Sequence, residues 1–532
     1  MTSSANSPGA LPTTLLRGGA VYNPAEPYAT AMLTVGDTVA WIGSEDGADL
    51  HVDAADAVID LGGALVTPAF VDSHVHATST GLALTGLDLS GAASEAELLD
   101  RVTAYARSLP SDAVVLGTGW DETAWSAAVA PNAAELDRAA GGREVYISRV
   151  DVHSAAVSSA LLAAVPEAAD AVGFRASGLV TQEAHHLLRA AAFGRVSEVQ
   201  RTDAQRAARA HAAELGIGSM HECGGPQISG EADFTGLLEL AAAEPGPYVF
   251  GYWGELTDPL KAIELGGVGA GGDLFIDGAI GSRTAALRDP YADAVETGDP
   301  AHGGVNYLDG EQIAGFLVAC AEAGVQPGFH VIGDYAMDLL VGGLALATDA
   351  VGEHRVRALT VRAEHAEMAD RKVIEKLARH GVVVSAQPGF DAAWGGTEGM
   401  YARRLGAGRA AGLNPFAAVS AAGVVLAFGS DSPVTALDPW TVVAAAAAPR
   451  NPAYRMTVRA AFAASTRGGW RAAAQSGVGV LAPGASATFA VWDTPGGVQG
   501  GLPVLLGDAE SPAPERPVCR RTVLHGETIF ER

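Results

Sequence analysis

Cysteine is rare in this chain, with three residues among 532. Cys223, Cys320 and Cys519 lie far apart and are odd in number, so they offer neither a disulfide framework nor a CxxC metal site. A chain that does not depend on disulfides suits a reducing compartment. We therefore expect a cytoplasmic protein.

Positive charge is also scarce. The chain carries 34 Lys and Arg residues against 61 Asp and Glu residues, and its formal net charge is -27. A field of this sign repels the phosphate backbone of nucleic acids and anionic lipid surfaces. We therefore expect no nucleic-acid partner, and we interpret the acidic residues as a solvated surface.

Long apolar segments are missing as well. No run of about 18 apolar residues, the minimum for a membrane-spanning helix, occurs in the chain. The N-terminal sequence "MTSSANSPGALPTTLLRGG" has no basic stretch followed by an apolar core, as a secretory leader would. We expect neither a leader nor a membrane partner.

Small and apolar residues are abundant instead. Hydrophobic residues make up 48% of the chain and charged residues 18%, and 66 residues are glycine. Such a chain can bury an extensive core and differs from disordered or coiled-coil sequences. Its length allows a large barrel plus a second unit.

Both ends of the chain have the pattern of short strands. Residues 1–65 contain "TLLRGGAVYN" and "AMLTVGDTVAWIG", and residues 476–532 contain "GVLAPGASATFAVWD" and "TVLHGETIFER", which combine apolar alternation with turn residues. Neither end has enough strands for a stable sheet with a buried face. We therefore predict one small β-sandwich that is built from both termini.

The region between them, residues 66–475, alternates apolar β-rich runs with Ala-rich helical patterns, which is typical of βα units. Eight candidate strands predict an α/β fold of the (β/α)8 TIM-barrel type; the fourth is "DLFIDG". The helical patterns "EQIAGFLVACAEAG" and "DRKVIEKLARHG" end in glycine, as helices often do. A long insertion after the first strand, about residues 82–205, is predicted to be a subdomain or lid at the face where barrels carry their sites.

Polar residues stand at the predicted carboxyl ends of the barrel strands. His74 and His76 in "TPAFVDSHVHATSTG" would face the same side of a strand, about 7 Å apart. The other strand ends add His221, Asp277, His330, His365 and Asp431. A single histidine of this kind is more often a core residue, but a parallel barrel brings all its strand ends to one face. The shared position therefore predicts a metal site.

The order "FVDSHVH", "FHVIGD", "RAEH", "FGSDSPV" resembles the metal-dependent amidohydrolase superfamily. The segments "GTGWDETAW", "DGAIGSRTAAL" and "LDPW" look like its branch of N-substituted formamide deformylases and YtcJ-like proteins. The resemblance covers nearly the whole chain, including the sandwich that is split between the termini.

This resemblance implies a divalent metal, zinc, with one ion expected and two as the alternative. The residues implied as metal ligands are His74, His76, His330, His365 and Asp431. Asp431 would also accept a proton as water attacks and return it to the leaving nitrogen. His365 could instead hydrogen-bond the water or substrate, so both residues are implied to be catalytic.

One departure from the family concerns lysine. Many members hold two metals bridged by a carboxylated lysine on the fourth strand, where this chain has Asp273. The three lysines of the chain lie in helical or connecting patterns: Lys261, Lys372 and Lys376. We therefore expect one tightly held metal, unless a carboxylate replaces the bridge; the candidates are Asp273, Asp277, Glu183 and Glu222.

Further side chains are candidates for substrate binding. Arg283 and Asp277 follow or end the fourth strand, and a fixed guanidinium can hold a carboxylate or carbonyl oxygen. Trp120 could wall an apolar pocket, with Trp125 beside it, although tryptophans are more often core residues. The residues predicted to orient other site groups are His153 and Asp334, whereas a solvated surface position is predicted for His185 and His186.

The leading hypothesis is a hydrolase of a non-peptide C–N bond in a small molecule: an amide, N-substituted formamide or cyclic amide. The alternative enzyme is a heterocycle aminohydrolase, which would need an acid such as Asp334 near the fifth strand. A barrel without catalysis that binds a ligand is the third hypothesis. As to assembly, a homodimer is an open alternative to the monomer.

Overall fold

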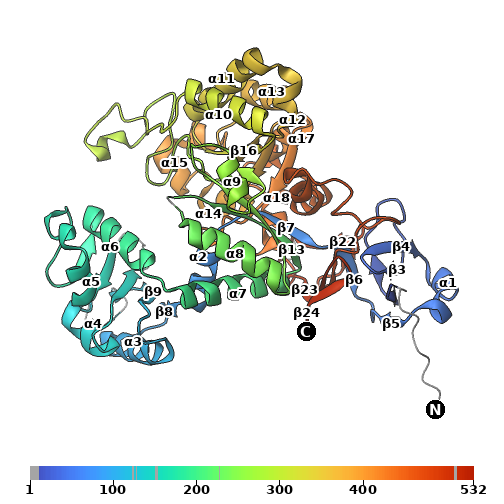
Figure 1. Ribbon diagram of the computed structural model, residues 1–532, viewed down its shortest axis with the longest axis horizontal. Helices are drawn as coiled ribbons and strands as arrows, with labels where there is room; N and C mark the ends of the chain where they lie inside the picture. Colours follow the sequence, from blue (N-terminus) through green and yellow to red (C-terminus); the bar gives the residue numbers. More distant parts are fainter. Residues whose placement is uncertain (1–10, 123–124, 127–128, 150–153, 227, 508–511) are drawn as a thin grey trace. The chain divides into compact units, whose positions relative to one another are not determined.

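The computed structural model describes residues 11–122, 125–126, 129–149, 154–226, 228–507 and 512–532. The chain divides into two units (Figure 1). One comprises the residues up to His76 together with Arg209–Arg532, and the other comprises Ala77–Ala208. The first unit contains the barrel and the terminal sheets, and the second contains the insertion after the first barrel strand.

An eight-stranded parallel sheet forms the barrel of the larger unit, and its strands follow one another in sequence order. They are β7 (Phe70–Val75), β13 (Ile217–Gly224), β14 (Tyr248–Trp253), β15 (Gly269–Ala270), β16 (Gln326–Val331), β17 (Arg362–His365), β18 (Val383–Ala386) and β19 (Val425–Phe428). A parallel bridge between Val75 and Ser432 joins the first strand to the segment after the last. The predicted TIM-type fold is thereby confirmed.

Helices stand between and after these strands. They are α8 (Glu231–Ala243), α9 (Leu260–Glu264), α10 (Gly310–Ala323), α11 (Asp334–Val351), α12 (Glu353–Ala358), α13 (Arg371–His380), α14 (Pro388–Trp394), α15 (Met400–Leu405), α16 (Ala407–Ala410), α17 (Phe416–Ala421), α18 (Pro439–Ala447), α19 (Val458–Ala463) and α20 (Gly469–Ala472). The two helices predicted to stop at glycine do so: α10 ends at Gly324 and α13 at Gly381, both with left-handed backbone, a conformation that glycine adopts without steric cost.

The fourth barrel strand differs from its prediction. "DLFIDG" was expected to be the strand, but β15 ends at Ala270, before this segment. Gly271 (φ 150°) and Gly272 (φ 78°) interrupt the regular sheet. The chain then returns beside β16 through an isolated bridge between Phe275 and His330. Like a β-bulge, this interruption changes the direction of the side chain that follows it, which is that of Asp273.

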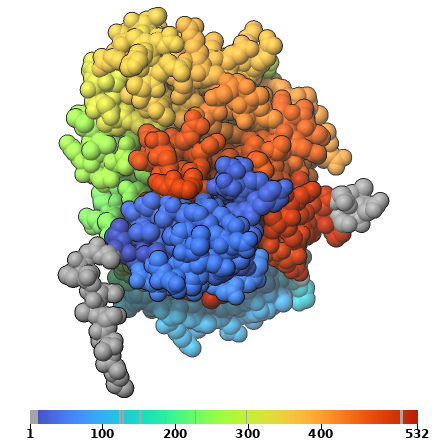
Figure 2. All heavy atoms as spheres, turned by 90° about the vertical axis from the view of Figure 1, so that its right-hand side faces the viewer, coloured from blue at the N-terminus to red at the C-terminus, as the bar shows by residue number. Residues whose placement is uncertain are grey.

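The terminal strands form two sheets that combine both ends of the chain. The first sheet contains β1 (Thr13–Arg17), β3 (Ala31–Val35), β4 (Thr38–Gly43) and β5 (Ala57–Asp60), with α1 (Glu45–Ala48) nearby. The second contains β2 (Ala20–Val21), β6 (Leu65–Pro68), β20 (Phe489–Asp493), β23 (Val518–Leu524) and β24 (Glu527–Glu531). A hairpin of β21 (Val498–Gln499) and β22 (Leu502–Pro503) lies between β20 and β23 in sequence. Figure 2 shows the blue N-terminal and red C-terminal segments side by side.

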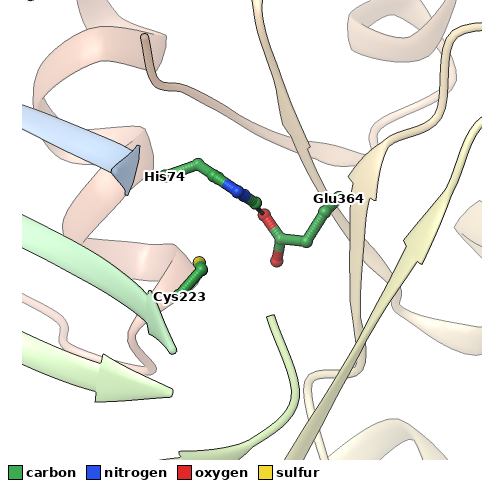
Figure 3. A group of neighbouring side chains, drawn as sticks. All are labelled: His74, Cys223 and Glu364. Atoms are coloured by element: carbon green, nitrogen blue, oxygen red, sulfur yellow. Dashed lines mark hydrogen bonds and ion pairs between the residues drawn. The ribbon is translucent and has the colours of Figure 1, made fainter. Parts of the chain in front are cut away.

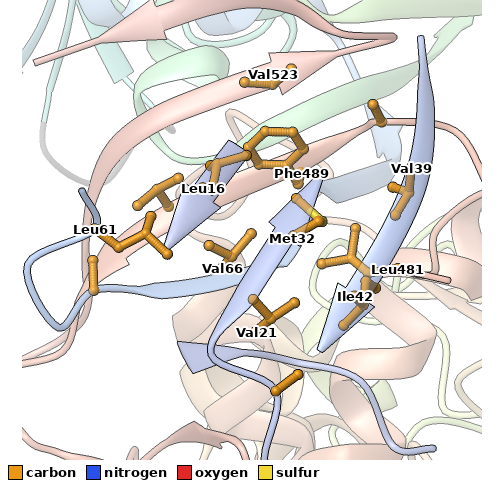
Figure 4. Close-up of a cluster of buried hydrophobic side chains, with 14 residues drawn as sticks. Leu16, Val21, Met32, Val39, Ile42, Leu61, Val66, Leu481, Phe489 and Val523 are labelled. Atoms are coloured by element: carbon orange, nitrogen blue, oxygen red, sulfur yellow. The ribbon is translucent and has the colours of Figure 1, made fainter. Parts of the chain in front are cut away.

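A shared apolar core joins the two sheets (Figure 4). Leu16 and Met32 of the first sheet belong to the same buried cluster as Val66, Phe489 and Val523 of the second. The neighbouring Leu15 belongs to another cluster, on the opposite side of the first sheet, because side chains alternate along a strand. The terminal sandwich predicted from sequence is confirmed.

The smaller unit has a five-stranded mixed sheet with the order β12-β11-β10-β9-β8. Its strands are β8 (Leu87–Asp88), β9 (Val115–Trp120), β10 (Val145–Arg149), β11 (Ser154–Val157) and β12 (Leu179–Thr181), and its helices are α2 (Ala77–Thr85), α3 (Glu95–Ser108), α4 (Ala133–Ala140), α5 (Ser159–Ala164) and α6 (Gln182–Gly194). Helix α7 (Glu198–Glu214) begins in this unit and continues into the larger one. Within the described part of the chain, no helix combines the length and apolarity that crossing a bilayer requires.

Candidate metal centre

Six ionisable side chains converge where the barrel strands end. They are His74, His76, Asp273, His330, His365 and Asp431. All are buried except His76, whose side chain is 12% exposed. Because the carboxyl ends of parallel barrel strands share one face, residues separated by hundreds of positions in sequence meet here.

Asp273 lies at the middle of this group. Its Oδ1 is 3.4 Å from His330 Nδ1, 3.6 Å from His74 Nε2 and 3.9 Å from His365 Nε2. Its Oδ2 is 3.3 Å from His76 Nε2. These separations exceed the usual N–H···O length of about 2.9 Å. They are near the roughly 3.4 Å between two ligands of a tetrahedral zinc that each lie about 2.1 Å from the ion.

Asp431 completes the group from the segment after β19. Its Oδ1 is 3.1 Å from His76 Nε2 and 3.6 Å from His74 Nε2. The Asp431 backbone N–H donates to the His74 carbonyl at 2.8 Å, and the His76 N–H donates to the Ser432 carbonyl at 3.0 Å. Asp431 has left-handed backbone, with φ 54°; such strain costs about 1–3 kcal/mol and is concentrated at functional sites.

The group contains six buried polar atoms that have no hydrogen-bond partner among the described residues: His74 Nε2, His76 Nδ1, Asp273 Oδ1, His330 Nδ1, His365 Nε2 and Asp431 Oδ1. All except His76 Nδ1 belong to the close imidazole–carboxylate pairs described above. A buried polar atom without a partner costs about 1–3 kcal/mol, so the atoms of these pairs need an explanation. A divalent cation coordinated by these nitrogen and carboxylate oxygen atoms would satisfy them. The residues therefore fit a metal centre.

The carboxylates and imidazoles of this group stabilise each other's charge. Burial alone raises the pKa of a carboxyl group, but His74 and its neighbours outweigh it and hold the pKa of Asp273 well below its usual range. The pKa of Asp431 is likewise lowered, against the effect of burial, by His74 and His76. The carboxylates in turn raise the pKa of His74, His76 and His365 despite burial, whereas burial lowers the pKa of His330. A metal binds the neutral imidazole, so a bound cation would take the place of the protons that the carboxylates otherwise hold on these rings.

A buried carboxylate, Glu364, holds His74 in place. Arg362 and Glu364 are fully buried on β17, and alternate residues of a strand share a face. Glu364 Oε2 lies 2.9 Å from His74 Nδ1 and accepts its proton, which leaves Nε2 directed at the carboxylates. Arg362 Nε donates to Glu364 Oε1 at 2.7 Å. This support is what a metal-ligating imidazole requires.

The floor of the site contains two further residues of β13. His221 Nδ1 lies 2.7 Å from Arg362 Nη1, and burial followed by the Arg362 charge holds the pKa of His221 well below its usual range. His221 is therefore a neutral acceptor for arginine. Cys223 lies beside His74 and Glu364, which point toward each other (Figure 3). Burial raises the pKa of this thiol to about 12, so it remains protonated.

His365 is fixed by its own neighbours. Its backbone is left-handed, with φ 69°, and its Nδ1 lies 2.8 Å from Gln387 Oε1. The Phe390 ring stacks on the imidazole at 5.9 Å between centroids. These contacts hold Nε2 toward Asp273.

Two of the predicted substrate-binding residues have structural partners. The Asp277 carboxylate is fully buried and accepts backbone N–H groups of Ala286, Ile332 and Gly333 at 2.7–2.9 Å. These bonds use its oxygens to hold the chain together, and its contact with substrate stays a prediction. The Arg283 guanidinium makes two bonds to Asp293, at 2.9 and 3.1 Å; its substrate role stays a prediction.

Asp334 was predicted to orient other groups of the site. Its Oδ1 instead accepts the Arg288 backbone N–H at 2.9 Å, at the start of α11. This contact joins the segment that contains Arg288 to the first turn of α11. The Asp334 carboxylate thus stabilises the local backbone.

Other candidates lie in the smaller unit. Trp120 is buried in the core of this unit with Trp125, and the Trp120 indole N–H donates to the Ile147 carbonyl at 3.0 Å. Trp120 therefore occupies a core position, which was the alternative to a role in the wall of a pocket. His185 is buried and its Nε2 bonds to the Tyr146 hydroxyl at 2.7 Å, so its predicted surface position is wrong. The structure gives no description of His153 or of the His186 side chain.

The structure thus brings together all five residues implied as ligands and adds Asp273 at their centre. Sequence reasoning placed Asp273 at the position of the family's bridging lysine and named it among four carboxylates that could replace the bridge, but it did not name Glu364 or Arg362. The available signal was the pair of charged residues two positions apart in the otherwise apolar strand "LTVRAEH". Such charges in a buried strand need partners.

Comparisons with known proteins identify the family of the chain. The family model described as "Amidohydrolase family" matches residues 57–530. The chain is 29% identical over 411 residues to the putative amidohydrolase YtcJ of Bacillus subtilis (72% of this chain, 73% of YtcJ) and 24% identical over 454 residues to N-substituted formamide deformylase of Arthrobacter pascens (78% and 80%). An uncharacterised metal-dependent hydrolase from Pyrococcus furiosus superposes with a TM-score of 0.75 at 25% identity (90% of this chain, 98% of that chain). The chain therefore belongs to the Amidohydrolase family and is an enzyme that acts on carbon–nitrogen bonds other than peptide bonds.

Proposed function

We propose that this enzyme hydrolyses the amide bond of a small molecule, an N-substituted formamide, another amide or a cyclic amide, with Asp431 as the proton shuttle. The observation that carries the proposal is the cluster of unpartnered, buried nitrogen and carboxylate oxygen atoms around Asp273 and Asp431. The similarity to N-substituted formamide deformylase supports the substrate class.

The metal proposed is zinc, because imidazole nitrogen and carboxylate oxygen are its usual ligands. His74, His76, His330 and His365 would hold it together with the carboxylates. A bound zinc ion supplies a Lewis acid and a water whose pKa is lowered to about 7.

Asp431 supplies the proton transfers. The carboxylate is ionised because His74 and His76 lower its pKa despite burial, so it can accept the proton of the attacking water. It returns this proton to the leaving nitrogen, and the products are a carboxylic acid and an amine. His365 presents Nε2 to the same space and would hold the metal or hydrogen-bond the substrate oxygen.

Product analysis tests this function. The zinc-loaded protein is incubated with N-substituted formamides, cyclic amides and aminated heterocycles, and amine and ammonia are measured separately. We expect amine, or the opened ring of a cyclic amide, and we expect Asp431→Asn to lose the activity. Ammonia release from heterocycles alone would favour the aminohydrolase alternative, for which Asp334 is the candidate acid. Metal binding without turnover of any compound would favour the binding barrel.

A reducing compartment is proposed for the protein. Its three cysteines are free, buried thiols, and a fold that does not use its cysteines in disulfides suits the cytoplasm.

A further inference from the structure

His330 differs from the other histidines of the candidate metal centre in the ring nitrogen that it presents. The other three direct Nε2 at the Asp273 carboxylate. His330 instead directs Nδ1, which lies 3.4 Å from Asp273 Oδ1. Because Nδ1 is nearer to the backbone of a histidine than Nε2, the position of a metal bound there depends closely on how the His330 ring is held.

The second ring nitrogen of His330 faces a backbone carbonyl. Its Nε2 lies 3.3 Å from the Gly278 carbonyl oxygen, and a carbonyl can only accept, so Nε2 carries the proton and donates it. In the neutral imidazole the lone pair is then on Nδ1. The hydrogen bond that one nitrogen makes sets which nitrogen is free to bind a metal. The Gly278 carbonyl thus leaves Nδ1 for the metal.

Asp277 fixes the position of that carbonyl. Its side chain is fully buried and accepts three backbone N–H groups, one on Oδ1 at 2.9 Å and two on Oδ2 at 2.7 and 2.8 Å. Two of the donors lie two and three positions after His330, and the third is Ala286. Because Gly278 is the next residue after Asp277, the carboxylate ties the peptide that carries the carbonyl to the segment that carries His330.

The backbone around this contact is closely packed. A Cβ on Gly278 would lie 2.2 Å from Thr284 Oγ1, and a Cβ on Gly333 would lie 2.0 Å from the Ala286 carbonyl oxygen. Thr284 Oγ1 also accepts the Ala279 N–H at 3.0 Å. Only glycine permits backbones to approach this closely. The Gly278 carbonyl is therefore held by the contacts of its own segment with the end of β16.

We infer that Asp277 is a positioning residue: by fixing the Gly278 carbonyl behind His330, it makes Nδ1 the nitrogen that His330 offers to the metal. This inference rests on the proposed function and gives Asp277 a role other than contact with substrate. Asparagine has nearly the same size but one acceptor oxygen. In either orientation its amide nitrogen would face a backbone N–H, so Asp277→Asn should displace the Gly278 peptide without removing a group that binds the metal.

Zinc affinity of the full-length protein, measured by competition with a zinc-binding dye, is the first test. We expect Asp277→Asn to bind zinc about 10–100-fold more weakly, which is the usual loss when a group that orients a metal ligand is removed. The visible absorption bands of the cobalt-substituted protein should also shift, because they depend on the arrangement of the ligands. A change in folding stability alone would move neither measurement in this way.

Asp391→Asn is the matched control. Asp391 is also a buried carboxylate that accepts a backbone N–H, that of Arg450 at 2.7 Å, but it does not belong to the group of candidate metal ligands. This variant should keep the zinc affinity and the cobalt spectrum of the wild type. The inference would be overturned if Asp277→Asn matched Asp391→Asn in both, and a raised KM as its only defect would make Asp277 a substrate contact instead.

The proton position on His330 is measured directly. Nuclear magnetic resonance of the metal-free protein with isotope-labelled histidine, at a pH where the imidazoles are neutral, shows which nitrogen carries the proton. The His330 signal is the one that is missing from His330→Asn. We expect the proton on Nε2 in the wild type, and a proton on Nδ1 would contradict the inference.

A second variant decides the outcome if Asp277→Asn does not fold. Thr284→Val removes the hydroxyl that accepts the Ala279 N–H beside Gly278, and it should weaken zinc binding in the same direction; an unchanged affinity would refute the role of this segment. The proposed function is tested separately. A wild type that hydrolyses amides, with Asp277→Asn unchanged in zinc affinity, would refute this inference alone, and a protein that binds no metal would refute both.

Discussion

Replacing Glu364 with glutamine should weaken both metal binding and folding, because this carboxylate supports His74 and Arg362 together. Glutamine has nearly the same size but carries no charge and one oxygen instead of two. In the wild-type protein one Glu364 oxygen accepts from His74 Nδ1 at 2.9 Å and the other from Arg362 Nε at 2.7 Å. The substitution can preserve at most one of these arrangements.

The expected magnitudes follow from burial. Arg362 and Glu364 are both fully buried, and removing one partner of a buried ion pair costs about 3–5 kcal/mol. Loss of the carboxylate that orients a metal-ligating histidine reduces metal affinity by about 10–100-fold. We expect Glu364→Gln to show both effects, measured by denaturant unfolding of the metal-free protein and by competition with a zinc-binding dye.

The pH dependence gives a further check on the same pair. Burial raises the pKa of Glu364, but Arg362 and His74 lower it overall, far below its ordinary value. A carboxyl group whose pKa is lower in the folded state than in the unfolded state stabilises the fold at pH values above the unfolded pKa, about 4.3 for glutamate. This stabilisation is lost as the pH falls from that value toward the pKa of the folded state. The stabilities of wild type and Glu364→Gln should therefore converge as the pH decreases from about 4.

Glu367→Gln is the matched control. Glu367 is also buried, but its carboxylate accepts from the Asn414 side chain and is not part of the group of candidate metal ligands. This variant should keep the metal affinity of the wild type. The reasoning would be refuted if Glu364→Gln bound zinc as tightly as Glu367→Gln and unfolded at the same denaturant concentration.

Three other changes test the rest of the molecule. Replacing His74 and His76 together with alanine should abolish bound metal, measured by mass spectrometry, while circular dichroism stays that of a folded barrel; stoichiometric zinc in this variant would contradict the site. Asp431→Asn should lower kcat by roughly a hundredfold or more while much of the metal is retained, and a loss of only a few-fold would mean that another base operates. Deleting the chain from residue 485 should destabilise residues 1–65, because their shared core loses Phe489 and Val523; an unchanged melting profile would show that the two ends are independent.

The sequence predicts those parts of the protein that follow a regular period. Alternation along β7 brings His74 and His76 to one site, and the apolar strands with their intervening helices predict the barrel. Asp273 was named only from the family resemblance, because the Gly271–Gly272 interruption that ends β15 before "DLFIDG" has no regular period from which its position could be predicted. The backbone partners of Asp277 were also not predictable, because a carboxylate at a strand end can accept from backbone N–H groups as well as contact a substrate.

Contacts between residues that are distant in sequence were the other feature that could not be predicted. Glu364 was overlooked because its role depends on His74, 290 residues earlier in the chain. Similarly, His185 lies in a segment whose sequence is typical of a surface helix. It is buried because it contacts Tyr146 on the sheet of the smaller unit. The local sequence pattern does not show which distant residue a side chain will contact. The ligand set could be predicted because the strand ends of a parallel barrel converge on one face.

The sandwich built from both termini has a consequence for biosynthesis. Thr67 on β6 and Trp492 on β20 are hydrogen-bonded across 425 residues of sequence, so β6 has no neighbour on this side until almost the entire chain has been made. At about 5–20 residues per second, the ribosome needs roughly 20–85 s to add those residues. During that interval the cluster around Leu16 and Met32 lacks its C-terminal members, Phe489 and Val523 among them. The nascent N-terminal strands are thus the segment of this enzyme with the longest need for chaperone protection, and the barrel has to form beside an unfinished sheet.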